Sequence, residues 1–179
     1  VYTSHYIKKN HPDSKVVFIG PCISKKLEAL QDHVKDYVDF VITFEELMGM
    51  FVAKEIEPAE IEVDGKIKDA SVTGRGYAVG GGVAQAVKER IHEINPDMDV
   101  KVECIEGLAE CVKVMRLAKL GMKNGLLLEG MACKNGCVGG PGTVVSAARS
   151  RKSVATFSKE SPYKSPADNK NIDPEDMPK

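Results

Sequence analysis

Short apolar runs, separated by stretches of helical periodicity, make up the hydrophobic pattern of this chain. Residues 16–19, 40–42 and 126–128 are continuous apolar runs, which are typical of strands buried on both faces. In residues 100–104 apolar and polar positions alternate, as they do in a half-buried strand. The pattern therefore predicts four strands.

Between these runs, apolar residues recur every three or four positions, as they do on one face of a helix. A helix is expected over each of four stretches: 24–38, 44–52, 83–94 and 108–120. Thr43 and Glu46 have the spacing of a capping box at the start of the second helix. Three glycines at 80–82 precede the third helix, and Asn95 before Pro96 ends it. Residues 55–76 are less periodic, and a small hairpin with a turn at Asp64 and Gly65, or an irregular excursion, is expected there.

Strands that alternate with helices indicate an α/β fold, a mostly parallel sheet flanked by helices. We assign residues 1–157 to this α/β lobe. Residues 158–179 contain four prolines and few apolar residues, so they are expected to form an extended or disordered tail.

Composition narrows the function classes. The 179 residues are 42% hydrophobic and 28% charged, and 25 basic against 26 acidic side chains leave a net charge of -1. This balance argues against a dedicated nucleic-acid or anionic-membrane binder. No apolar run approaches the roughly 18 residues of a membrane helix, and no charged-then-apolar leader opens the chain. A cytoplasmic protein is expected, and the start at Val1 fits a piece of a longer polypeptide.

Five cysteines are an odd number for a chain without a secretion signal, so metal, redox or core roles come before disulfides. Cys104 and Cys111 fall on the apolar faces of their predicted strand and helix, and we assign both to the core. Cys22, Cys133 and Cys137 each follow a predicted buried strand. The carboxyl ends of parallel strands are where the chemistry of such sheets usually lies.

Cys133 and Cys137 are four residues apart in a segment rich in glycine. Thiolates are soft ligands that favour iron-sulfur clusters, zinc and copper(I), and glycines let backbone amides approach the sulfur atoms. The alternative is that both are small core residues of one helical face.

Cys22 follows a proline that places its thiol at the turn, and Lys25 and Glu28 are neighbours on the helix that follows. A cation beside a thiolate lowers the thiol's pKa and can hold an anionic ligand. The alternative is that the lysine and the glutamate form an ordinary surface pair.

Three segments together resemble iron-only (FeFe) hydrogenases. Residues 21–28 (PCISKKLE) resemble the second signature of the large catalytic subunit, and residues 129–140 (EGMACKNGCVGG) resemble the third. Residues 77–86 (YAVGGGVAQA) resemble the family's glycine-rich segment between those signatures. Order and spacing agree over nearly the whole chain.

The resemblance implies a lobe of the hydrogenase catalytic domain and a 4Fe-4S cubane held by four cysteines, one of which bridges to a two-iron carbonyl/cyanide unit. Cys22 and Cys133 would ligate the cubane, and Cys137 would ligate it and bridge. The other residues that match family site positions are Lys25, which would donate to an iron-bound cyanide; Glu28, on the proton path; Met131 and Tyr77, which would pack around the two-iron unit; and Gly139 and Gly140 of the third signature.

The family's first signature, which carries the fourth cubane cysteine and a proton-relaying cysteine, is absent. The chain therefore resembles a part of a hydrogenase that is inactive alone and needs a missing N-terminal lobe, with an iron-sulfur electron carrier such as ferredoxin as the parent's partner. Gly20 stands where catalytic members usually have methionine, and residues 140–142 (GPG) replace a glycine run. These changes suggest a hydrogen-sensing member. A hydrogenase-like iron-sulfur assembly or scaffold protein, or a cluster-free α/β module, are the alternatives.

Overall fold

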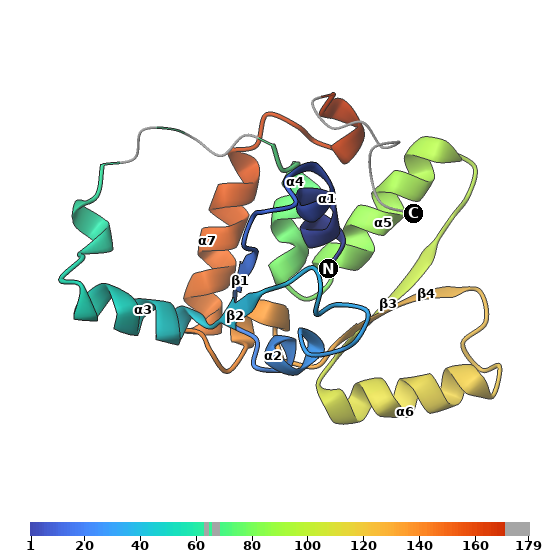
Figure 1. Cartoon of the computed structure of the whole chain (residues 1–179). Helices are drawn as coiled ribbons and strands as arrows, with labels where there is room; N and C mark the ends of the chain where they lie inside the picture. The colour runs from blue at the N-terminus through green and yellow to red at the C-terminus, as the bar shows by residue number, and fades with distance from the viewer. Residues whose placement is uncertain (63–64, 66–68, 171–179) are drawn as a thin grey trace. The chain divides into compact units, whose positions relative to one another are not determined.

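The computed structural model describes residues 1–62, 65 and 69–170, and they form two compact units. The first unit holds the described residues of 1–66 together with Pro141–Val144 and Lys170. The second holds those of 67–140 and Val145–Asn169. Each unit contains one pair of parallel strands with helices packed around it (Figure 1). The predicted α/β class with parallel strands is therefore confirmed.

The first unit is built on β1 (Val17–Ile19) and β2 (Phe40–Ile42), with Phe18 opposite Val41. Both predicted strands are confirmed, but their burial on both faces is wrong, because all three residues of β1 are at least 40% exposed. In the described part of the chain this sheet has only two strands. Neither strand is therefore central, and the apolar run lacks the second covering layer that the prediction assumed.

The helix predicted over 24–38 ends early. The structure has only α2 (Ser24–Glu28), followed by turns in which several amides bond to the carbonyl three residues back. Val34 and Val38 are buried as predicted, whereas Leu27 and Leu30 are exposed. Asp32 and His33, which favour helices weakly, fall in the middle of the predicted span, and packing of the two valines stabilises the turns.

Three further helical segments complete the described first unit: α1 (Tyr2–Asn10), α3 (Phe44–Ala53) and η1 (Pro58–Glu60). The predicted capping box is present, because Thr43 Oγ1 accepts from the Glu46 amide and the Glu46 carboxylate accepts from the Thr43 amide. The helix α1 was not predicted. Of the hairpin expected around Gly65, Val63 and Asp64 lie outside the described residues, and the described flanks hold helical turns.

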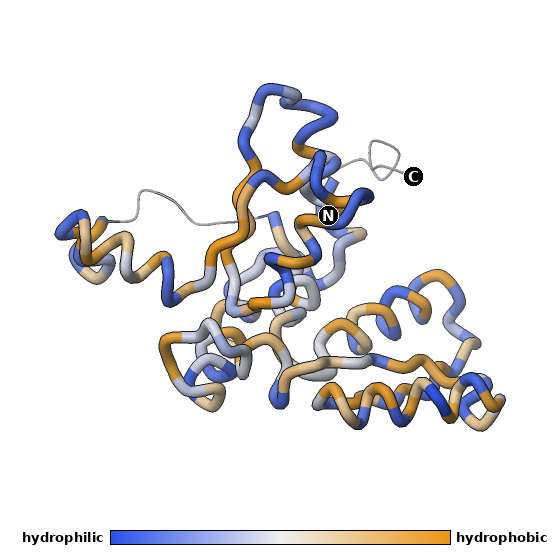
Figure 2. Tube along the Cα trace, turned by 60° about the horizontal axis from the view of Figure 1, so that its bottom comes forward, coloured by the Kyte–Doolittle hydropathy of each residue, from blue (hydrophilic) through white to orange (hydrophobic). Residues whose placement is uncertain are grey.

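The second unit is built on β3 (Lys101–Glu106) and β4 (Leu126–Met131), with Cys104 opposite Glu129. The helices α5 (Gly82–Ile94) and α6 (Leu108–Lys119) form as predicted. Their apolar faces are only partly covered: Ala84, Ala86 and Val114 are buried, but Ile94, Leu108 and Met115 are largely exposed. Figure 2 shows hydrophobic and hydrophilic positions alternating along α6.

Four more helical segments belong to the second unit: α4 (Val72–Arg75), η2 (Gly76–Ala78), α7 (Ala147–Lys159) and η4 (Pro166–Asp168), with η3 (Gly136–Gly139) described below. The helix α7, which was not predicted, packs on α4. The buried Arg75 joins them, since its Nη1 donates to the Phe157 carbonyl (2.9 Å) and its guanidinium lies 4.2 Å from the centre of the Phe157 ring.

The segment after α7 is fastened to the second unit. Ser161 Oγ donates to the Ala70 carbonyl (2.7 Å), and Asn169 Nδ2 donates to the Asp69 carbonyl (2.7 Å). The boundary expected at residue 158 falls within the last turn of α7, and residues 171–179 of the expected tail lie outside the described part of the chain.

Candidate functional site

The turn that carries Cys22 leaves the carboxyl end of β1. The Gly20 amide donates to the Ile42 carbonyl (3.1 Å), which extends the pairing of β1 with β2 by one residue. Pro21 then redirects the chain, and Cys22 is a free, half-buried thiol just before α2. The predicted position of Cys22 at a strand end is confirmed.

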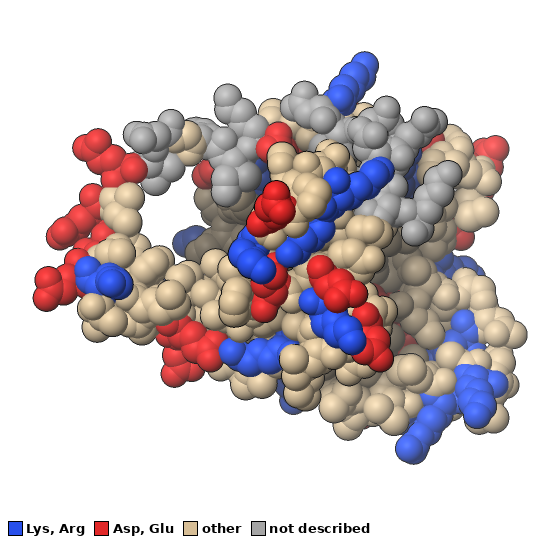
Figure 3. Space-filling model, in the orientation of Figure 1, with Lys and Arg blue, Asp and Glu red and all other residues tan. Residues whose placement is uncertain are grey.

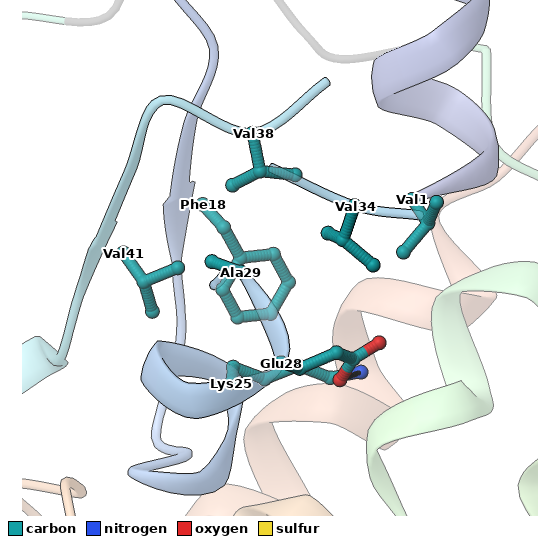
Figure 4. A pocket seen from close by; sticks show the side chains of 8 residues that line it. All are labelled: Val1, Phe18, Lys25, Glu28, Ala29, Val34, Val38 and Val41. Atoms are coloured by element: carbon teal, nitrogen blue, oxygen red, sulfur yellow. Dashed lines mark hydrogen bonds and ion pairs between the residues drawn. The ribbon is translucent and has the colours of Figure 1, made fainter. Parts of the chain in front are cut away.

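Lys25 and Glu28 form an ion pair one turn apart on α2, with Lys25 Nζ donating to Glu28 Oε2. Their side chains are 42% and 36% exposed. Figure 4 shows their charged ends side by side at the edge of a small hollow lined mostly by apolar side chains. The other lining residues are Val1, Phe18, Ala29, Val34, Val38 and Val41. An ammonium has three donor hydrogens, so Lys25 can serve Glu28 and a second acceptor together.

Lys26, the neighbour of Lys25 on α2, makes contacts with two other elements. Its Nζ donates to both oxygens of Glu46 (2.9 and 2.8 Å) and to the Val41 carbonyl (3.1 Å). The Lys26 ammonium, as the largest influence, lowers the pKa of the Glu46 carboxyl. These contacts tie α2 to β2 and to the first turn of α3.

The loop that carries Cys133 and Cys137 leaves the carboxyl end of β4 in the second unit. Cys133 is half-buried, and Cys137 is exposed on η3. Asn135 and Gly136 have positive φ values of 69° and 76°, and a Cβ on Gly139 would lie 2.1 Å from the Lys134 carbonyl oxygen. The loop is thus folded so tightly that its glycines are required.

Two neighbouring segments of the second unit hold this loop in place. The Gly80 amide donates to the Asn135 carbonyl (3.3 Å), and the Glu106 carboxylate accepts from the Asn135 amide (2.9 Å). Within the loop, the amide of the buried Gly140 donates to the Cys137 carbonyl (2.9 Å). The glycine-rich segment after Tyr77 and the cysteine loop are therefore in contact.

Tyr77 and Met131 lie at the borders of these segments. Tyr77 is in η2, which packs against η3, and it is 46% exposed. Met131 is the half-buried last residue of β4, and its carbonyl accepts from the Gly107 amide (2.8 Å).

The core assignment of Cys104 is wrong, because Cys104 is exposed on β3. Cys111 is half-buried rather than fully buried, and its Sγ contacts the carbonyls of Ile105 (3.8 Å) and Met131 (3.6 Å). The reason is the same as for the apolar faces above: in the described chain β3 has one strand neighbour, and part of its surface stays open.

Sequence reasoning gave no role to Glu129, which the structure makes a central contact of the second unit. Glu129 is only 7% exposed, and its carboxylate accepts hydrogen bonds from the amides of Gly81, Val83 and Ala84. It thus caps α5 from the neighbouring strand. An acidic residue after three leucines, downstream of a glycine triplet, is the sequence signal that could have indicated it.

The three cysteines are the right type of ligand for an iron-sulfur cluster. Cys22, Cys133 and Cys137 lie after strand ends and form no disulfide, and thiolates are the usual ligands of such clusters. One ligand is missing, however, because a site built from four cysteines is not completed by three. Within residues 1–62, 65 and 69–170, no group of three or more histidine, cysteine or acidic side chains is arranged to hold a metal ion.

Residues 1–141 match the family model described as "Iron only hydrogenase large subunit, C-terminal domain". The chain belongs to this family. It is 30% identical over 168 residues to iron hydrogenase 1 of Clostridium pasteurianum, a match that covers 73% of this chain and 29% of that protein. The resemblance inferred from the cysteine signatures is confirmed.

Solved [FeFe]-hydrogenases share the fold. A variant of apo HydA1 from Chlamydomonas reinhardtii is 20% identical with a TM-score of 0.66, over 94% of this chain and 60% of that chain. An [FeFe]-hydrogenase described in connection with oxygen inactivation of its H cluster is 18% identical with a TM-score of 0.62, over 96% and 61%. The chain therefore spans about 60% of these solved relatives and 29% of the curated one.

No helix among the described residues has the length and apolar character needed to span a bilayer. On the face drawn in Figure 3, both acidic and basic side chains are present, in keeping with the 26 acidic and 25 basic residues of the sequence.

Proposed function

We propose that this chain supplies part of the cluster-binding region of an FeFe hydrogenase, a hydrogen:acceptor oxidoreductase. Cys22 and Cys133 would ligate a 4Fe-4S cubane, and Cys137 would ligate it and bridge to a two-iron carbonyl/cyanide unit. That centre, when bound, supplies the heterolytic cleavage and formation of hydrogen. The proposal rests mainly on one observation. This chain belongs to the hydrogenase family, and all three cysteines lie in segments that follow the carboxyl ends of parallel strands.

The chain's own residues would provide charge and a proton route. Lys25 would donate a charge-assisted hydrogen bond to an anionic iron ligand, and Glu28, already its hydrogen-bond partner, would accept or pass a proton. Tyr77 and Met131 would pack around the two-iron unit. Gly139 and Gly140 would let backbone amides approach the cluster sulfurs, because no side chain stands in the way.

The remaining parts would come from polypeptide outside this sequence. A fourth thiolate and a proton-relaying cysteine would complete the site, and an iron-sulfur carrier such as ferredoxin would exchange electrons with the parent. The chain by itself would be inactive. Five cysteines that form no disulfide suit a reducing compartment such as the cytoplasm.

A hydrogen-sensing parent is the second candidate, favoured by the surroundings of Gly20. Gly20 is buried, and a Cβ there would lie 2.8 Å from Cε1 of Phe18. The Phe18 ring thus occupies the space that the methionine usual at this position would need. Different packing beside Cys22 would alter the reactivity of the centre rather than remove it.

Infrared spectroscopy tests the proposal. The chain is co-expressed anaerobically with the polypeptide that carries the first signature, and then supplied with iron, sulfide and a two-iron precursor. We expect carbonyl and cyanide bands, their loss in Cys137→Ser, and their retention in the control Cys111→Ser. A well-folded complex without these bands would contradict the hydrogenase proposal. An iron-sulfur absorption alone would instead identify the scaffold class.

A further inference from the structure

The segment that follows the Cys137 loop returns to the first unit. Pro141–Val144 belongs to that unit, and there the Gly142 amide donates to the Pro21 carbonyl (3.1 Å). The Glu45 amide at the start of α3 donates to the Gly142 carbonyl (3.3 Å). Both hydrogen-bonding groups of Gly142 are therefore used at the carboxyl edge of the β1–β2 sheet, beside the turn that carries Cys22.

Space, and not backbone conformation, requires glycine at position 142. Gly142 is buried, and a Cβ would lie 2.7 Å from Thr43 Cβ, 2.8 Å from Thr43 Cγ2 and 3.4 Å from the Pro21 carbonyl carbon. Thr43 has little freedom to move, because it is 5% exposed and forms the capping box with Glu46. Any side chain at 142 would have to displace either the cap of α3 or the Cys22 turn.

We propose that Gly142 is a positioning residue for the metal site: it clamps the chain that leaves Cys137 onto the turn that carries Cys22. Gly142 is five positions after Cys137, and five fully extended residue steps span about 18 Å. Pro141 removes part of the remaining freedom by fixing its own φ. The clamp thus sets an upper limit on the separation of the two thiols before any iron binds.

This inference rests on the proposed function for its purpose, but its test needs no metal. In a metal-free chain with Cys104, Cys111 and Cys133 replaced by serine, a short bismaleimide links Cys22 to Cys137. The initial rate of linking, divided by the rate of labelling with N-ethylmaleimide, reports how often the two thiols meet. We expect Gly142→Val to lower this ratio at least about fivefold, because the effective concentration of one thiol at the other falls when the tether is released.

Gly49→Ala is the matched control, since a Cβ on Gly49, in α3 of the same unit, meets nothing within 4 Å. It should leave the ratio unchanged. Pro141→Gly adds no atom but loosens the same segment, so we expect it to lower the ratio as well. It replaces Gly142→Val in the test if circular dichroism shows that Gly142→Val does not fold. If the folded Gly142→Val and Pro141→Gly variants have the same ratio of linking rate to labelling rate as the parent chain, the proposal that Gly142 acts as a clamp is wrong. The infrared experiment above reports on the hydrogenase proposal separately.

Discussion

The five cysteines lie in different surroundings, and these surroundings determine how reactive each thiol is. Cys22, Cys133 and Cys137 are on turns after strands and are at least partly accessible. Cys111 is half-buried against two carbonyls. Cys104 is exposed, yet desolvation first and the Glu129 carboxylate second raise the pKa of its thiol. Exposure therefore does not make Cys104 reactive, because the thiolate is the nucleophile.

Cys104 should accordingly be alkylated more slowly than an exposed cysteine whose pKa is not raised. Since its pKa in the folded chain is raised, its thiolate fraction at pH 8 is below that of the same cysteine in urea. We expect the rate of Cys104 modification by iodoacetamide, followed by mass spectrometry from pH 7 to 10, to rise at a higher pH in the folded than in the unfolded chain. Coincident pH profiles would contradict this reading.

Among the elements, α5 shows how a helix can depend on a residue from a neighbouring strand. Its N-cap position is Gly81, which has no side chain to bond the first amides. The carboxylate of Glu129 on β4 accepts those amides instead. A negative charge at this end also favours the helix dipole. The glycine triplet and the acidic residue therefore act as one cap, although 47 positions separate Gly82 from Glu129.

Glu129→Gln should lower the free energy of unfolding by about 2 kcal/mol, because the charge and one of its two acceptor oxygens are lost at a buried site. Glu110→Gln is the control, since the side chain of Glu110 on α6 is 60% exposed and forms a surface ion pair with Lys113. Its effect should be about 0.5 kcal/mol or less. Urea unfolding followed by circular dichroism measures both, and equal effects of the two variants would refute the cap.

At the scale of the whole molecule, much apolar surface is open on both units. In the first, Leu27, Leu30 and Phe40 are each at least 60% exposed, and in the second Leu108 and Met115 are similarly exposed. A chain that leaves this much apolar surface in water offers sites for other apolar groups.

We expect the isolated chain to enhance the fluorescence of 8-anilinonaphthalene-1-sulfonate in its native state, without urea. Met115→Lys should reduce this signal, because it removes an apolar side chain that is 69% exposed. The same change should shift the free energy of unfolding by no more than about 0.5 kcal/mol, as for other surface positions. A large loss of stability with an unchanged dye signal would show that Met115 is a core residue.

The apolar runs determined where β1, β2 and β4 form, and the Thr43/Glu46 spacing determined where α3 starts, because both depend on neighbours along the chain. The cysteine signatures likewise identified the family, because each is a short run of neighbouring residues that can be recognised without the fold. Tertiary structure decided what depends on partners far along the sequence. Which strand faces stay open, the role of Glu129 and the close fit of Gly142 against Thr43 all follow from contacts that no local pattern encodes.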